Sequence, residues 1–127
     1  KVRLVKGAYA EPETHAYPRK KDVDAAYRRQ MERLLDDGNY PAIATQDDAI
    51  VDVARGYATR MGIDKSRFEF QMMYGIRRDL QEQLVDQGYN MRVYVPYGEM
   101  WYPYFMRRMG ERPANLMFAL RNIVRPS

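Results

Sequence analysis

The chain has 127 residues, of which 46% are hydrophobic and 30% charged, which suits a single domain with a buried core. Its net charge of +4 comes from 21 basic and 17 acidic residues that are largely interleaved, as on solvated helix faces, so we expect no nucleic-acid partner. No apolar run approaches the roughly 20 residues that span a bilayer, no signal peptide is evident, and the absence of cysteine excludes disulfides and thiol catalysis. The chain does not begin with Met, so we expect it to be part of a longer protein.

Strands and helices are predicted to alternate from the amino end. Apolar and basic residues alternate over 2–7, which predicts a strand that ends at Gly7. A polar segment follows, and a helix is then predicted over 23–35, with Asp22 as its N-cap and Gly38 as its end. The helix is indicated by apolar residues at helical spacing, namely Val23, Ala26, Tyr27, Met31, Leu34 and Leu35.

The middle of the chain repeats this order. A short buried strand is predicted over 41–45, and Asp47 or Asp48 is expected to cap a helix that runs to about Met61. The apolar face of that helix would consist of Ile50, Val51, Val53, Ala54, Tyr57 and Ala58. Strict alternation over 68–72 predicts a third strand.

The last third begins with a helix predicted over about 78–87, with Leu80, Leu84 and Val85 pointing inward. A fourth strand is predicted over 91–95, and two final helices over 101–110 and 114–124.

Four strands that alternate with helices indicate an α/β fold with parallel strands, either in a doubly wound sheet or in a (β/α)8 barrel. No Gly-x-Gly-x-x-Gly follows any predicted strand, which disfavours a dinucleotide-binding sheet. In barrels, the functional groups lie at the carboxyl ends of the strands. The predicted strands here carry polar residues, which favours a half-barrel. These polar residues are Arg3, Thr45, Glu69, Gln71, Arg92 and Tyr94. A half-barrel leaves two strand edges unpaired, so we expect the other half upstream, on another chain, or replaced by self-association.

Four segments together resemble one family, the bacterial monofunctional proline dehydrogenases. In chain order they are Arg-Leu-Val-Lys-Gly-Ala-Tyr (3–9), Phe-Glu-Phe-Gln-Met-Met-Tyr-Gly (68–75), Arg-Val-Tyr-Val-Pro-Tyr-Gly (92–98), and Trp-Tyr-Pro-Tyr-Phe-Met-Arg-Arg (101–108) with Glu-Arg-Pro (111–113). The resemblance implies that residues 1–127 are the C-terminal half of a distorted, FAD-binding (β/α)8 barrel, with the N-terminal half absent from this chain.

The resemblance implies a cofactor site and a substrate site. Arg3 would lie against the flavin ring as the catalytic cation. The residues implied to contact FAD are Arg3, Val5, Lys6, Gly7, Ala8, Thr45 and Gln46, where many members carry His in place of Gln46. Arg107 and Arg108 would hold the carboxylate of proline, since paired guanidinium groups suit a carboxylate. Glu111 would position them, and Tyr94 and Leu4 would pack against the substrate ring. No metal site is implied.

The implied reaction is the oxidation of L-proline to 1-pyrroline-5-carboxylate, with hydride transfer to FAD and electrons passed to a quinone. A bacterial cytoplasmic location is implied, with peripheral association at the inner membrane. We expect the isolated chain to be an incomplete, inactive fragment. Two alternatives remain open from the sequence: another TIM-barrel enzyme, and a non-catalytic α/β assembly module.

Overall fold

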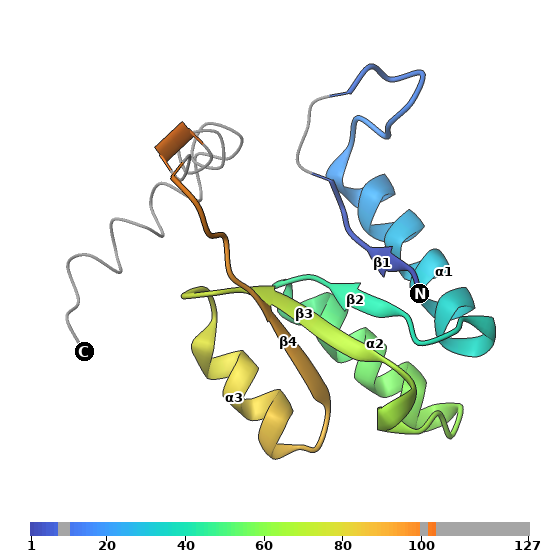
Figure 1. Ribbon diagram of the computed structural model, residues 1–127. Helices are drawn as coiled ribbons and strands as arrows, with labels where there is room; N and C mark the ends of the chain where they lie inside the picture. Colours follow the sequence, from blue (N-terminus) through green and yellow to red (C-terminus); the bar gives the residue numbers. More distant parts are fainter. Residues whose placement is uncertain (8–10, 100–101, 104–127) are drawn as a thin grey trace. The chain divides into compact units, whose positions relative to one another are not determined.

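The computed structural model describes residues 1–7, 11–99, 102 and 103 (Figure 1). Lys1–Gly7 and Glu11–Val95 form one compact unit, which contains the sheet, its helices and the core. In chain order its elements are β1 (Arg3–Leu4), α1 (Lys20–Asp37), β2 (Ala42–Ala44), α2 (Asp48–Arg60), the short 3-10 helix η1 (Lys65–Arg67), β3 (Glu69–Met73), α3 (Arg78–Asp86) and β4 (Asn90–Tyr94).

All four strands are parallel, and each pairs with the next one along the chain in the order β1-β2-β3-β4. A doubly wound sheet would reverse its strand order at a switch point, whereas a barrel adds strands in one direction. The four described strands contain no such reversal. The parallel sheet and its helices confirm the predicted α/β fold, and the strand order is that of part of a (β/α)8 barrel.

The core lies between one face of the sheet and the three helices (Figure 1). The strands contribute the residues that occupy matching positions in the register, namely Leu4, Ile43, Phe70 and Met91. Phe70 is fully buried and meets Phe68 and Tyr89 in edge-on ring contacts with centroids 5.6 and 5.4 Å away. The helices contribute the apolar faces predicted from their spacing, including Tyr27, Met31, Leu35, Ile50, Val51, Ala54, Leu80 and Leu84.

The predicted helix ends are correct in two cases and wrong in one. Asp47 caps α2, because its carboxylate accepts a hydrogen bond from the backbone N–H of Ala49. Gly38 ends α1, where a Cβ atom would collide with the carbonyl oxygen of Leu34. Asp22 is not the N-cap of α1, since the helix begins at Lys20 and Asp22 lies in its first turn. There its carboxylate accepts a hydrogen bond from Arg19 at 2.6 Å.

Two further expectations need correction. The first strand is shorter than the predicted 2–7, since β1 pairs only over Arg3–Leu4. Val85 does not point inward but is 55% exposed, because the nine-residue helix α3 buries a narrow face through Leu80 and Leu84. The helices predicted over 101–110 and 114–124 lie outside the described residues, apart from residues 102 and 103.

Leu84 and Val85 provide a direct test of this packing. In the full-length protein, Leu84→Ala should lower the free energy of unfolding by about 2–5 kcal/mol, because it leaves a cavity in the core. Val85→Ala on the same helix should change it by less than about 0.5 kcal/mol. Denaturant unfolding of both variants measures the difference, and equal losses would contradict the orientation of α3.

The other face of the sheet, here called the polar face, carries Arg3, Glu69, Gln71, Arg92 and Tyr94. Glu69 is only 4% exposed. Its carboxylate accepts hydrogen bonds from Arg92 Nε at 2.7 Å, Arg92 Nη2 at 2.9 Å and Gln71 Nε2 at 2.6 Å. The hydrogen bond from Arg92 is the main reason why the pKa of Glu69 falls to about 2.

This pairing predicts an acid-dependent stability. Because the pKa of Glu69 is lowered in the folded state, its contribution is complete above about pH 4.5 and is lost as the pH falls toward about 2. Arg92→Met in the full-length protein should lower the free energy of unfolding at pH 7, because it leaves the buried carboxylate of Glu69 without its bidentate partner. The difference from the wild type should shrink between pH 4.5 and 2. Unfolding measured across this range tests it, with the exposed Arg67→Met as the control; a pH-independent difference would show that Arg92 acts only through packing.

Candidate active site at the carboxyl ends of the strands

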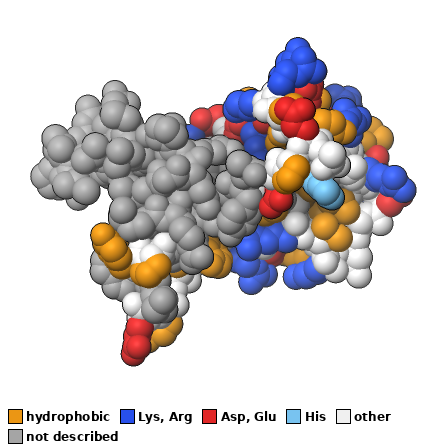
Figure 2. Space-filling model, turned by 90° about the horizontal axis from the view of Figure 1, so that it is seen from above, with side chains coloured by type: hydrophobic (Ala, Val, Ile, Leu, Met, Phe, Trp, Pro, Cys, Tyr) orange, Lys and Arg blue, Asp and Glu red, His pale blue; other side chains and the backbone are white. Residues whose placement is uncertain are grey.

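The carboxyl ends of the parallel strands lie at one edge of the sheet, where barrels carry their functional groups. The residues that follow the strands there are 5–7 after β1, 45–47 after β2 and 74–77 after β3, and Tyr94 ends β4. Acidic and basic side chains are interspersed on the described part of the surface seen in Figure 2, which shows no segregation of one sign.

Arg3 and Tyr94 meet on the polar face although they come from the first and the fourth strand. The guanidinium carbon of Arg3 lies 5.4 Å from the centroid of the Tyr94 ring, a cation–π distance. Strand β2 presents only Ala42 and Ala44 on this face, so no large side chain from it stands between them. The structure thus brings together the residue expected to act as the catalytic cation and the residue expected to pack against the substrate ring.

Lys6 lies in a cluster of charged residues at the same edge. Its ammonium nitrogen is 2.7 Å from Asp24 Oδ1 and 2.7 Å from Asp47 Oδ2, and its side chain is 13% exposed. Lys20 also pairs with Asp24. Hydrogen bonds from Lys20 and Lys6 lower the pKa of Asp24 to about 2, and the bond from Lys6 lowers the pKa of Asp47.

The turn after β2 carries Thr45 and Gln46. Thr45 is buried, and its hydroxyl oxygen accepts a hydrogen bond from the backbone N–H of Asp47 at 3.2 Å. The side-chain oxygen of Gln46 is buried and has no hydrogen-bond partner among the described residues. A buried polar oxygen without a partner is uncommon, and this one can accept a hydrogen bond from water or from a ligand.

The end of β1 is open. Gly7 has a φ of +79°, which favours glycine, and nothing lies within 4 Å of the position of a Cβ atom. Val5 is exposed. Leu4 points to the opposite face, where it packs against the helix-side core and its carbonyl oxygen accepts a hydrogen bond from Tyr27 at 3.1 Å. Its expected contact with a substrate ring stays a prediction.

The remaining expected site residues, Ala8, Arg107, Arg108 and Glu111, lie outside the described residues.

Sequence reasoning missed Asp24 and Arg77. Asp24 is spaced four residues from Lys20, a signal of a helix-surface pair, but nothing in the sequence connects it with Lys6. Arg77 precedes α3 in the left-handed region at φ +53°, and it pairs with Asp48 at 2.6 Å and with Asp79. It thereby links the loop after β3 to the beginning of α2.

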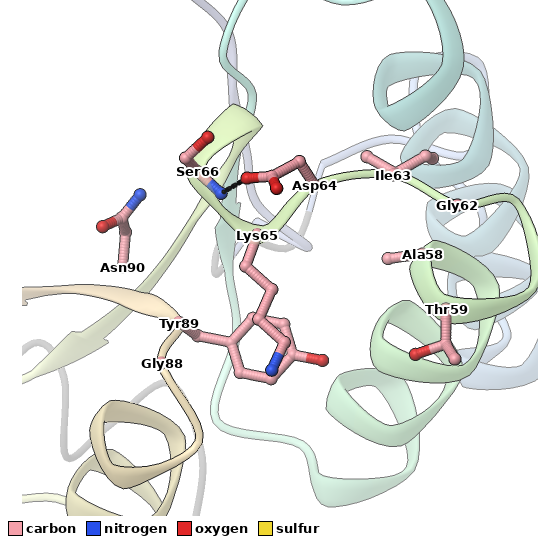
Figure 3. Close-up of a pocket in the computed structure, with 10 residues that line it drawn as sticks. All are labelled: Ala58, Thr59, Gly62, Ile63, Asp64, Lys65, Ser66, Gly88, Tyr89 and Asn90. Atoms are coloured by element: carbon pink, nitrogen blue, oxygen red, sulfur yellow. Dashed lines mark hydrogen bonds between the residues drawn. The ribbon is translucent and has the colours of Figure 1, made fainter.

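A cleft of about 600 Å³ lies at the amino ends of β3 and β4 (Figure 3). None of the expected site residues lines it. Lys65 crosses it, donating a hydrogen bond to the carbonyl oxygen of Gln87 at 2.6 Å and lying 4.8 Å above the Tyr89 ring. Its polar groups therefore serve local structure.

No group of three or more His, Asp or Glu residues in the described ranges could hold a metal ion. None of the described helices combines the length and the apolar character that a membrane span requires.

A family model described as proline dehydrogenase matches residues 1–121. Proline dehydrogenase 2 of Bacillus subtilis (strain 168) is 52% identical over 124 residues, which cover 98% of this chain and 41% of the relative. Proline dehydrogenase of Deinococcus radiodurans is also 52% identical over 124 residues, covering 98% of this chain and 40% of the relative. This chain therefore spans about two fifths of the length of these relatives.

A solved structure extends the comparison to the fold. The crystal structure of proline utilization A (PutA) from Bdellovibrio bacteriovorus, inactivated by N-propargylglycine, superposes with a TM-score of 0.76 at 35% identity. The match covers 84% of this chain and 13% of that one. The strand order, the residues gathered at the carboxyl edge and a family match over residues 1–121 agree, and the chain belongs to the proline dehydrogenase family.

Proposed function

We propose that the protein to which this chain belongs oxidises L-proline to 1-pyrroline-5-carboxylate with FAD as the hydride acceptor, and that residues 1–127 supply the C-terminal half of its barrel. The observation that carries the proposal is the meeting of Arg3 and Tyr94 on the polar face, in a chain of the proline dehydrogenase family. The names of the relatives, proline dehydrogenase in both cases, support the substrate.

The described residues fit a flavin at the carboxyl edge. The unpartnered oxygen of Gln46 can accept a hydrogen bond from a bound group, and the open backbone at Gly7 permits a close approach. Arg3 supplies an exposed cation on the polar face. We assign the cofactor site to Arg3, Val5, Lys6, Gly7, Ala8, Thr45 and Gln46. When bound, FAD would accept a hydride together with its negative charge.

The side chains of this chain would bind and orient the substrate. Arg107 and Arg108 would grip the carboxylate of proline, and Glu111 would hold these arginines in place. Tyr94 would pack against the pyrrolidine ring. Holding the carboxylate at a fixed point directs the ring carbon next to nitrogen toward the acceptor, which is catalysis by positioning. The amine of proline must be unprotonated before the hydride can leave.

We further propose that a quinone reoxidises the flavin, at a bacterial cytoplasmic location with peripheral association at the inner membrane. Both the quinone acceptor and the membrane association follow from the family resemblance. A proline-dependent reduction of a soluble quinone by the purified full-length protein tests the acceptor, and sedimentation with vesicles tests the association.

The substrate clamp gives the first functional prediction. Anaerobic L-proline should bleach the flavin absorbance of the full-length protein. Arg107→Ala or Arg108→Ala should raise the proline concentration required by tens- to thousands-fold, since truncating one partner of a buried ion pair costs about 2–5 kcal/mol. Arg→Lys should not restore affinity, because an ammonium lacks the planar fork.

The control for this experiment is flavin content, which should stay near that of the wild type because both arginines are assigned to the substrate. A full-length protein that binds no flavin, or whose flavin proline does not bleach, would overturn the proposed function. Unchanged proline affinity in both alanine variants would show that Arg107 and Arg108 do not bind the carboxylate of proline.

Arg3 gives the second functional prediction. Arg3→Met should slow proline-dependent flavin reduction about 10²- to 10³-fold while weakening proline binding much less, since Arg3 is assigned to charge that develops during the reaction. Stopped-flow measurement at several proline concentrations separates the two effects. An unchanged limiting rate would show that Arg3 only supports the packing of Tyr94.

A further inference from the structure

We propose that Lys6 is a positioning residue, whose ammonium group joins Asp24 and Asp47 to hold the turn at Thr45 and Gln46 against the end of β1. Lys6 would then belong to the cofactor site by holding its shape, and its side chain would not bind an anionic group of the cofactor. The inference rests on the proposed function, because it concerns how the same cofactor site is held in shape.

The contacts of Lys6 join three elements. Lys6 follows β1, Asp24 lies in α1, and Asp47 lies in the turn between β2 and α2. Both N–O distances are 2.7 Å, and the side chain of Lys6 is 13% exposed. The ammonium group donates a hydrogen bond to Asp47 Oδ2 and forms an ion pair with Asp24 Oδ1. The lysine therefore connects the strand that carries Arg3 with the turn that carries Gln46.

Asp47 transmits this connection to the turn. One oxygen, Oδ1, accepts the N–H of Ala49 and so begins α2, while the other, Oδ2, accepts from Lys6. The N–H of Asp47 in turn donates to the hydroxyl of Thr45. Movement of the Asp47 carboxylate would consequently shift both Thr45 and the buried, unpartnered oxygen of Gln46.

The charges of the cluster argue against a free ammonium group. Lys6 faces Asp24 and Asp47, and Lys20 pairs with Asp24 and lies 4.0 Å from Asp47. Withdrawing Lys6 to bind a ligand would leave two partly buried carboxylates with one exposed lysine. Separating a partly buried charge from its partner is unfavourable. The lowered pKa values of Asp24 and Asp47 mean that both acids are ionised at neutral pH.

The alternative role for Lys6 is direct binding of an anionic group of FAD. The positioning role and the direct role predict opposite changes of FAD affinity when Asp47 is replaced by Asn. Asn at position 47 can still cap α2, because Asn and Asp are comparable N-caps. Asp47→Asn therefore removes the ion pair but keeps the helix start. Positioning predicts weaker FAD binding in this variant. Direct binding predicts equal or tighter binding, because a competing carboxylate has been removed.

The experiment titrates FAD into full-length apoprotein and follows flavin fluorescence, together with the visible circular dichroism of the bound flavin. Asp47→Asn and Lys6→Met should each raise the dissociation constant by about 10- to 100-fold and alter the dichroism, as expected for a displaced supporting residue. Lys6→Arg should restore most of the affinity, since a guanidinium can bridge two carboxylates. The matched controls are Lys20→Met, a loss of charge at the exposed edge of the same cluster, and Asp64→Asn, the same substitution at the cap of η1; both should bind like the wild type.

The outcomes separate the two proposals. A wild-type apoprotein without affinity for FAD would overturn the proposed function. A wild type that binds FAD, with an Asp47→Asn variant that binds it equally well or more tightly, would overturn the positioning role alone. If Lys6→Met does not fold, Asp47→Asn still decides, because its helix cap is kept.

Discussion

The parallel register of the four strands is the constraint on which the rest of the structure depends. Leu4, Ile43, Phe70 and Met91 occupy matching positions, and their burial against the helices determines which way every strand is turned. A shift by one residue would expose all four. Because side chains alternate along a strand, the same burial assigns Arg3, Glu69, Arg92 and Tyr94 to a shared polar face.

Two ion networks occupy different levels of this sheet. Glu69 and Arg92 pair near the amino ends, with Gln71 and the bidentate guanidinium satisfying a carboxylate that is 4% exposed. Lys6, Asp24 and Asp47 pair at the carboxyl ends, where they join two strand ends to the start of two helices. The first network stabilises the sheet, and the second lies at the edge where we propose the cofactor site. Arg77, paired with Asp48, extends this edge to the loop after β3.

Much of the fold could be predicted because its signals are local. The helices α1, α2 and α3 follow the spacing of their apolar residues, and the cap of α2 follows from Asp47. The errors arose where local signals compete. Asp22 is a residue type that favours the N-cap of a helix, yet α1 begins earlier, at Lys20, and contains Asp22 in its first turn. Val85 fits the apolar stripe of α3, but this short helix buries only Leu80 and Leu84 against the core and leaves Val85 exposed.

The sequence by itself determined the α/β class, the alternation of strands with helices and the family, because apolar period and the four motifs are properties of neighbouring residues. It also named Arg3, Tyr94, Thr45 and Gln46 as site residues through that resemblance. The tertiary structure alone decided that Arg3 reaches Tyr94 across two strands, and that Lys6 is held by Asp24 and Asp47. These contacts join residues 91, 18 and 41 positions apart. They depend on how the strands and helices pack together, and a pattern of neighbouring residues carries no information about that packing.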